Sequence, residues 1–467
     1  MNARRFFRFA LRPLRAFGAP WRSRPFPSVT RAPGQGRVLI VNAYSTLNRG
    51  DAVILDGLIA SVRNAGATSI VVAAPTGIGE MSRRRALGAD SVVPMPLVDD
   101  LLQAPGWMRR MYPLLAARMA WRLVAFAVRA TVAPESSPAL RAYLESDLVI
   151  STGGAYLGGR RPGINLLTGF QIMLARSLGR ECLIAPVTVK PMSFIVAKVL
   201  SVALRGTTIF TRDAPTLDRL RQVGLGARLA SDLAFRSPSA ARAAAEPRAE
   251  HEGLVIAWAP RQFGSDSDAH RARGAIEVAA MAALTSLVRK HDARLLLITQ
   301  SNAEGIENDL AVIERVRVHL AADVRSRTVS LPPAADIGES IAQYARADVL
   351  YGFRLHAAIL ALMAGTPSLV VAYEAKVTGV LEQVGLADWV IEPAEAMDAS
   401  VVVKRLLSLA ESQVARRIKA ARRAADIAHV PFEDELRRRL ATPVEAGRSS
   451  HGAVIMPSTH SPQRLGR

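Results

Sequence analysis

The chain has 467 residues, of which 50% are hydrophobic and 21% charged, so it is long enough for two or three globular domains and is neither wholly disordered nor fibrous. Its single cysteine, Cys182, excludes a disulfide scaffold and a cysteine-based zinc cluster, and it fits a reducing compartment. The formal net charge is +20, so the positions of the basic residues decide which partner they indicate.

Much of the positive charge lies at the start of the chain. Residues 1–37 hold nine arginines and no acidic residue, with phenylalanines and leucines between them. We define residues 1–36 as the basic arm. Its pattern predicts either a segment that lies on an anionic membrane surface or a solvated, disordered arm. No long apolar run follows the charges, so the arm is a poor signal peptide.

A second basic and apolar stretch covers residues 107–132 and has a helical pattern. It predicts an ordinary helix whose arginine stems cover apolar surface, with a membrane-surface helix as the alternative. It contains no uncharged run long enough to span a bilayer. Neither basic region carries a nucleic-acid-binding motif, so we expect no nucleic-acid partner.

Short apolar strands alternate with helical stretches through the first half of the chain. This pattern predicts a mostly parallel sheet covered by helices on both faces, in an N-terminal α/β domain over residues 37–236. A helix is expected over residues 52–64. The strands are expected at 38–42, 69–74, 91–94, 147–151, 182–187 and 207–211.

Residues 237–253 are small, polar and interrupted by proline, which predicts an interdomain linker. The alternation then restarts and predicts a C-terminal α/β domain over residues 254–440. Residues 441–467 are rich in Ser, Pro, Gly and Arg and are expected to be a disordered tail. Two doubly wound domains predict an enzyme with a cleft between them. The C-terminal strands are expected at 254–259, 294–300, 349–353 and 368–373, with helices at 274–290, 306–320 and 356–364.

Two loops that follow strands of the N-terminal domain are candidate ligand contacts. The first contains Asn48, Gly50 and Asp51 and leads into a helix, so either it binds a ligand or Asp51 is the helix N-cap. The second contains Gly153 and Gly154, which either let a ligand approach the backbone or satisfy a tight turn with positive φ.

The strongest candidates lie on neighbouring strand-end loops of the C-terminal domain. Arg354 and His356 follow one strand, and Lys376 follows the next. Arginine and lysine would bind an anion, and histidine would exchange a proton near neutral pH. Arg261 follows the strand that opens this domain and is a weaker third cation. The remaining histidines do not cluster in the sequence, so a catalytic metal is not expected.

These motifs together resemble the polysaccharide pyruvyl transferase family, over about residues 37–390. The most specific part is the run from Phe353 to Ile359 with Gly365, Pro367, Tyr373 and Lys376 after it. The resemblance also rests on Asn48-Arg49-Gly50-Asp51, on Gly153-Gly154 after their strand, and on Thr211-Arg212-Asp213.

The resemblance implies a fold similar to the two-domain glycosyltransferase type B architecture. It implies that the enolpyruvyl skeleton of phosphoenolpyruvate moves onto two hydroxyls of one sugar, forming a cyclic pyruvate ketal and releasing phosphate. Phosphoenolpyruvate would be a co-substrate, with no cofactor or metal. The C-terminal domain would bind it through Arg354, Lys376 and Arg261, with His356 as general acid or phosphate ligand. The N-terminal domain would hold the acceptor through Asn48, Gly50, Gly153 and Gly154, with Asp51 as base or hydroxyl orienter.

One departure concerns the segment Ser151-Thr152-Gly153-Gly154-Ala155, where the family often has a longer run of glycines. The expected location is the cytoplasm, with the basic arm offering peripheral contact at the inner membrane face beside a lipid-linked acceptor. Two other functions fit the same architecture: a nucleotide-sugar-dependent glycosyltransferase, and a catalytically idle, membrane-associated partner in an export or assembly complex.

Overall fold

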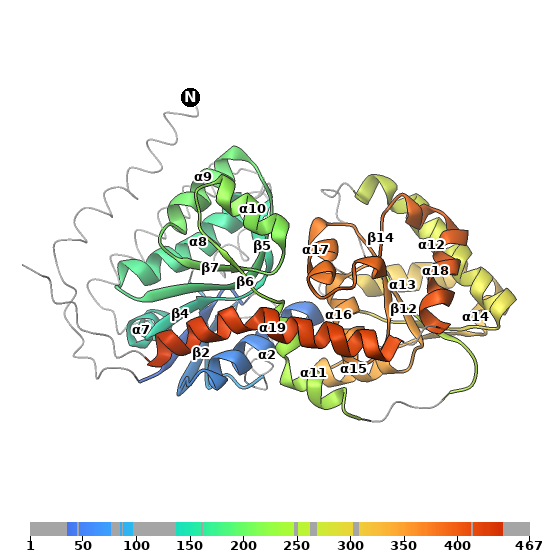
Figure 1. Cartoon of the computed structure of the whole chain (residues 1–467), viewed down its shortest axis with the longest axis horizontal. Coiled ribbons are helices and arrows are strands. Elements are labelled where there is room, and N and C mark those ends of the chain that lie inside the picture. Colours follow the sequence, from blue (N-terminus) through green and yellow to red (C-terminus); the bar gives the residue numbers. More distant parts are fainter. Residues whose placement is uncertain are drawn as a thin grey trace, which may run out of the picture.

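The computed structural model describes residues 35–441, except for 44–45, 76–84, 86, 97–136, 160–161, 247–250, 262–268, 302–307 and 412–413. The predictions for residues 1–34, for the stretch 107–132 and for the tail after residue 441 lie outside the described residues. Figure 1 shows two α/β domains side by side, with one long helix, α19, running along both.

The N-terminal domain contains a sheet whose described strand pairs are all parallel, in the order β3-β2-β1-β4-β6-β7-β8, with β5 paired to β6. Its strands are β1 (Arg37–Val41), β2 (Ser69–Ala74), β3 (Ser91–Pro94), β4 (Leu148–Ser151), β5 (Gly154–Gly159), β6 (Glu181–Met192), β7 (Thr208–Thr211) and β8 (Arg228–Leu229). Its helices are α2 (Arg49–Asn64), α7 (Pro138–Glu145), α8 (Pro162–Ser177), α9 (Phe194–Ala203), α10 (Ala214–Gln222) and the short 3-10 helix η3 (Leu233–Arg236).

The C-terminal domain contains a second parallel sheet, in the order β11-β10-β9-β12-β13-β14. Its strands are β9 (Val255–Ala259), β10 (Arg294–Leu297), β11 (Thr328–Ser330), β12 (Val349–Gly352), β13 (Ser368–Val371) and β14 (Val390–Ile391). Its helices are α12 (Ala269–His291), α13 (Asp309–His319), α14 (Ala322–Arg325), α15 (Ile337–Ala345), α16 (Leu355–Met363), α17 (Ala375–Gln383), η4 (Ala387–Trp389), η5 (Glu395–Met397) and α18 (Ala399–Glu411). The prediction of two doubly wound domains is confirmed.

The first part of the expected linker is helical. Helix α11 (Pro238–Ala243) has Ser237 as its N-cap and proline in its first turn, both of which favour a helix start. The side chain of Asp56 in α2 accepts hydrogen bonds from the Ser237 hydroxyl and from the Ser239 N–H. These contacts attach the start of α11 to the N-terminal domain. Such long-range contacts cannot be predicted from local composition.

The last helix returns to the N-terminal domain. In α19 (Val414–Ala441), Phe432 packs edge-on against Phe210 of β7, with ring centroids 5.2 Å apart. Near its end, Arg439 pairs with Glu181 of β6 at 2.8 Å. Toward its start, Arg422 donates to the carbonyl of Leu362 in α16. The helix therefore connects both domains (Figure 1), although its sequence falls within the predicted C-terminal domain.

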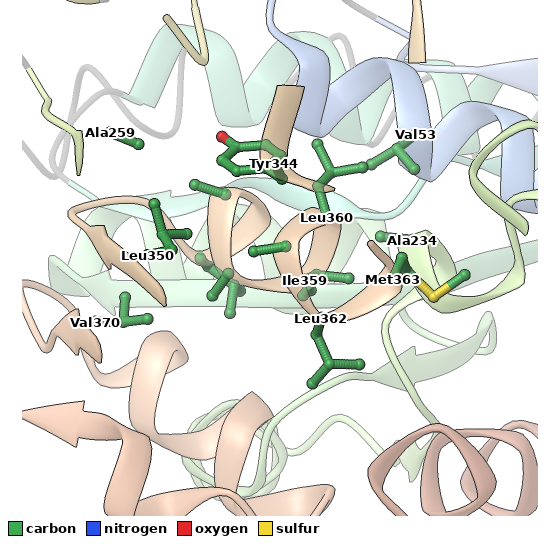
Figure 2. Close-up of a cluster of buried hydrophobic side chains, with 14 of the residues drawn as sticks. Val53, Ala234, Ala259, Tyr344, Leu350, Ile359, Leu360, Leu362, Met363 and Val370 are labelled. Atoms are coloured by element: carbon green, nitrogen blue, oxygen red, sulfur yellow. The ribbon is translucent and has the colours of Figure 1, made fainter. Parts of the chain in front are cut away.

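Helix α16 is the apolar centre of the domain junction. Eight of its nine residues are buried. Figure 2 shows Leu360 near Val53 of α2 and Met363 near Ala234 of η3. Helix α16 of the C-terminal domain therefore packs against elements of the N-terminal domain. The one half-buried residue of α16 is His356, which lies in its first turn.

Candidate active site

His356 lies where the two domains meet. Strand β12 ends at Gly352, and α16 begins three residues later, so the imidazole is placed at the carboxyl end of the C-terminal sheet. Its Nε2 is 3.2 Å from Nη1 of Arg212 and 3.6 Å from Oδ2 of Asp232. Both partners come from the N-terminal domain, since Arg212 directly follows β7 and Asp232 directly precedes η3. The candidate site is therefore assembled from both halves of the chain.

Arg212 is held by a buried polar network. Its Nη1 donates to Oδ2 of Asp232 at 2.6 Å, and its Nε donates to the Thr188 hydroxyl at 2.9 Å. That hydroxyl donates to Asp213, whose other carboxylate oxygen accepts from the Thr216 N–H and caps α10. The arginine side chain is 1% exposed, and its Nη2 has no hydrogen-bond partner within the part of the chain that the structure describes. A buried donor of this kind can bind an anionic group.

The charges in this group shift two pKa values. Burial alone would raise the pKa of Asp232, but Arg212, together with His356 and a backbone N–H, holds that pKa well below its usual range. Burial lowers the pKa of His356, and Arg212 and Lys376 act in the same direction, while Asp232 opposes them. The imidazole is therefore mainly neutral at pH 7.

Gly50 packs directly beneath the His356 ring. A Cβ atom at position 50 would overlap the imidazole Nδ1 and come within 2.7 Å of its Cγ. Asn48 is the N-cap of α2, and its side-chain oxygen accepts from the Gly50 N–H at 3.0 Å. Asp51 follows in the first turn, so the N-cap role considered for Asp51 belongs to Asn48. The loop also meets the C-terminal domain, where Asn48 forms a β-bridge with Ser301.

The two glycines of the second loop are explained by the backbone. Gly154 has a φ of 122°, a conformation that favours glycine. A Cβ at Gly153 would lie 2.6 Å from the carbonyl oxygen of Pro186 in β6. The turn between β4 and β5 therefore requires glycine at both positions, whether or not a ligand contacts it.

A second group of charged side chains, which we call the cationic cluster, consists of Lys190, Arg261 and Lys376 around Glu374. Nζ of Lys376 lies 2.7 Å from Oε2 of Glu374, and Nζ of Lys190 lies 4.0 Å from Oε1. The Arg261 guanidinium is 4.3 Å from the ring centroid of Tyr373. Three cations thus surround one carboxylate, which leaves an excess of positive charge.

The cationic cluster joins both domains. Lys190 belongs to β6 of the N-terminal sheet, whereas Glu374 and Lys376 follow β13. Burial alone would raise the pKa of Glu374, but Lys376, Lys190 and Arg261 lower it to about 2. Burial lowers the pKa of Lys190, and Glu374 opposes this shift. The influence of Lys376 on the His356 pKa also links the cluster electrostatically to the imidazole.

Arg354 is placed differently from the other predicted cations. Its Nε and Nη2 both donate to the carboxylate of Asp309 at 2.8 Å, in a pair that is almost fully buried. Asp309 also accepts from the N–H of Ser301, the residue that forms the β-bridge with Asn48, so Arg354 is linked through Asp309 to that bridge. The structure therefore places Arg354 in a buried ion pair with Asp309, and the arginine that lies beside His356 is Arg212.

Sequence reasoning assigned no role to Arg212 or Lys190. Arg212 had a detectable signal, because it follows strand β7 as Arg354 follows β12. Lys190 lies within a long strand, and only the pairing across the domains reveals its position. Among the described residues, no three His, Cys, Asp or Glu side chains gather as metal ligands would.

The family model for polysaccharide pyruvyl transferase matches residues 48–375, more than two thirds of the chain. The chain belongs to the polysaccharide pyruvyl transferase family. The matched region contains Gly50, Lys190, Arg212, Asp232 and His356, and it ends one residue before Lys376. No curated protein matches the sequence.

Solved structures share the fold of this family member at low sequence identity. A sucrose-phosphate synthase from Thermosynechococcus elongatus has a TM-score of 0.50 and 14% identity, covering 87% of this chain and 99% of that one. A trehalose-6-phosphate synthase has a TM-score of 0.52 and 13% identity, covering 87% and 100%. A putative UDP-N-acetylglucosamine 2-epimerase from Listeria monocytogenes has a TM-score of 0.52 and 12% identity, covering 85% and 93%. The chain therefore has the glycosyltransferase type B architecture, as the resemblance implied.

Proposed function

We propose that the protein transfers the enolpyruvyl group of phosphoenolpyruvate onto two hydroxyls of one sugar, forming a cyclic pyruvate ketal and releasing phosphate. The acceptor would belong to a cell-surface polysaccharide, a lipid-linked repeat or a glycolipid, and the reaction would use no cofactor or metal. Family membership supports pyruvyl transfer. The observation that carries the proposal is the meeting of His356 with Arg212 across the domains, in the electrostatic range of the cationic cluster.

The charges of the site suit this co-substrate. Phosphoenolpyruvate carries a carboxylate and a phosphate, so its binding requires several cations in one place. Lys376 and Arg261 would bind it from the C-terminal domain, and Lys190 and Arg212 from the N-terminal domain. The buried Nη2 of Arg212 supports this assignment, because an anionic oxygen would supply its missing hydrogen bond.

The chemistry requires one proton donor and one proton acceptor. Protonation of the methylene carbon turns it into a methyl group and leaves an oxocarbenium-like centre, to which the first sugar hydroxyl adds as it loses its proton. The bond to phosphate then breaks, and the second hydroxyl closes the ring. One hydroxyl proton thus replaces the proton delivered to the methyl group, and the other leaves with phosphate. We assign His356 as the acid, either toward the methylene carbon or toward the departing phosphate.

The acceptor would bind on the N-terminal side of the site. Asn48, Gly50 and Asp51 belong to the start of α2, which contacts His356 through Gly50. A half-buried carboxylate in this turn suits the orientation of a sugar hydroxyl, or the removal of its proton. Gly153 and Gly154 border the same sheet edge, where strand β4 ends.

The test is phosphate release from phosphoenolpyruvate in the presence of lipid-linked or aryl glycosides. The wild type should release phosphate only with an acceptor, and the product should be heavier by one pyruvate less one water. His356→Gln should lose this activity. The matched control is His319→Gln, because His319 is exposed on α13 and its Nδ1 lies 2.7 Å from the carbonyl oxygen of Arg315, away from the candidate site.

Binding is measured in the same samples, so that a missing acceptor is distinguished from a wrong donor. Phosphoenolpyruvate should raise the melting temperature of the wild type, while a uridine or guanosine diphosphate sugar should not. Stabilisation by the nucleotide sugar alone would overturn the proposal in favour of a glycosyltransferase. Binding of neither donor would contradict both functions.

A further inference from the structure

Eight of the ten residues of helix α9 are apolar, although the helix lies at the surface; its polar residues are Lys198 and Ser201. Its inner face consists of Val196, Leu200 and Ala203, which are buried. Its outer face exposes Phe194 by 85%, together with Ile195 and Val202 at 43% and 48%. A surface helix of a globular protein normally carries a broad polar face opposite its buried face, which α9 lacks.

The exposure on α9 is concentrated compared with the rest of the molecule. Three of the ten large apolar side chains that are exposed in the described ranges lie on this ten-residue helix. Most of the others are single residues on separate elements, such as Val278 on α12 and Val318 on α13. Isolated exposed side chains are ordinary, whereas a group on one face marks an interaction surface.

The surroundings of this face are basic. Lys198 is exposed one turn after Phe194, and Arg205 is exposed just beyond the end of the helix. Arg176 of α8 lies beside Gly206, at the same end. An apolar face surrounded by cations is complementary to a bilayer that carries anionic headgroups.

The face is also connected to the candidate site through β6. This strand carries Lys190 of the cationic cluster and ends at Met192, two residues before Phe194. Figure 1 shows α9 at the top of the N-terminal domain, and the helix packs on α8, β5 and β6. A surface that held α9 would therefore lie near the end of β6 that carries Lys190.

We propose that the outer face of α9 binds the surface of an anionic lipid bilayer, with Phe194, Ile195 and Val202 entering the interface and Lys198 and Arg205 contacting the headgroups. The contact is peripheral, because no helix among the described residues is long and apolar enough to span a membrane. The inference goes beyond the proposed function, since it does not depend on the reaction. It also differs from the membrane contact considered for the basic arm.

Three other occupants are disfavoured by charge. A second copy would bring Lys198 and Arg205 against the same basic face. The basic arm and residues 97–136 both carry an excess of arginine, so either segment would likewise bring positive charge against a basic face. The basic arm and a second copy each give a distinct result in the experiment below.

The experiment measures, in the full-length protein, whether the outer face of α9 contacts lipid. The only native thiol, Cys182, is buried, so Ile195→Cys can be labelled selectively with an environment-sensitive fluorophore. Vesicles of phosphatidylcholine and phosphatidylglycerol should shift the emission to the blue, and brominated acyl chains should quench it. Neutral phosphatidylcholine vesicles should give a much weaker change. Val318→Cys, labelled in the same way on an exposed site of the C-terminal domain, should not respond.

A second comparison measures binding. The pair Phe194→Ser and Val202→Ser should lower the fraction that sediments with anionic vesicles by about tenfold, whereas Val278→Ser with Val318→Ser should leave it unchanged. Both pairs should melt at the wild-type temperature, because the replaced side chains are exposed. If the protein binds vesicles while the emission of the label at position 195 stays unchanged, the proposal is overturned and the binding is assigned to the basic arm. Absence of vesicle binding, or a change in oligomeric state caused by the α9 pair, would also overturn it.

Discussion

The imidazole of His356 lies between opposing electrostatic influences. Burial lowers its pKa, and Arg212 and Lys376 reinforce that shift, while Asp232 raises it. An incoming phosphate would neutralise the two cations and add negative charge near the ring. The protonated imidazole, which can act as an acid, should therefore form when substrate binds.

We expect the wild type to take up protons when phosphoenolpyruvate binds at about pH 7, and its affinity to weaken as the pH rises. Calorimetry in buffers of different ionisation enthalpy measures this uptake. His356→Gln should take up fewer protons, and the difference corrects for the proton that the ligand itself exchanges. The exposed-site variant His319→Gln should match the wild type. Equal uptake in His356→Gln and wild type would show that the imidazole does not change its charge.

The contact between Gly50 and His356 gives a second prediction. A methyl group at position 50 would overlap the ring, while the backbone there does not need glycine for its φ. Gly50→Ala should therefore fold and displace the imidazole, and kcat should fall by about 100-fold, the usual effect of misplacing a reacting group by about 1 Å. Gly274→Ala is the matched control, because nothing lies within 4 Å of its added Cβ. Wild-type kcat in Gly50→Ala would exclude a role for the position of the ring.

At the scale of the element, α19 holds a buried histidine against the N-terminal domain. The ring of His429 is 3.1 Å from the Ser61 hydroxyl and 3.3 Å from the Ser231 hydroxyl. Burial, reinforced by Arg236, lowers its pKa to about 3. The two serines can satisfy the neutral ring. A charged ring would be buried with poor compensation, because Glu433 lies 4.0 Å away and the attraction of Asp232 only partly opposes the shift.

This histidine should make the fold sensitive to acid. Its pKa is lower in the folded state than in the unfolded state, so protonation favours unfolding, and stability is lost as the pH falls below about 6.5. The loss from this one group is about 1.4 kcal/mol per pH unit until the pH approaches the folded value. Urea unfolding between pH 7 and 5 should therefore show a smaller decline for His429→Gln than for wild type. An identical decline would mean that His429 does not titrate in this way.

Elements built from local patterns were predictable, whereas contacts between distant segments were not. The apolar runs of β9, β12 and β13 read directly as strands, and both domains followed from their alternation with helices. The return of α19 to β7 depends on the packing of Phe432 against Phe210, which no local pattern encodes. The pairing of Arg354 with Asp309 likewise joins two strand-end loops, so the sequence could not show which anion Arg354 meets.

At the scale of the whole molecule, the two domains share an apolar junction and a polar one. The apolar junction is α16 against α2 and η3, including Leu360 near Val53 (Figure 2). The polar junction is the cationic cluster, where Lys190 of one domain faces Glu374 of the other. Closure of a cleft enzyme around its substrate would act on the polar junction, because the apolar one already excludes water.

Glu374 is the acidic side chain that a substrate would have to displace from this junction. Its carboxylate is 2.7 Å from Lys376 and is ionised, with a pKa lowered to about 2, so it competes with an anionic ligand for the same cation. Glu374→Gln should therefore strengthen the binding of phosphoenolpyruvate and of inorganic phosphate by about five- to tenfold, with the largest gain at low ionic strength. Calorimetric titration at two salt concentrations measures both effects.

The control is Glu395→Gln, which removes an exposed carboxylate paired with Arg405 at 3.3 Å on the far helix η5 and should leave the affinity unchanged. Weaker binding in Glu374→Gln would mean that the carboxylate orients Lys376 toward the ligand instead of competing with it. The sign of the change thus decides whether the link from Lys190 to Glu374 must break or persist when the substrate is bound, and so whether this contact between the domains belongs to the empty or to the loaded enzyme.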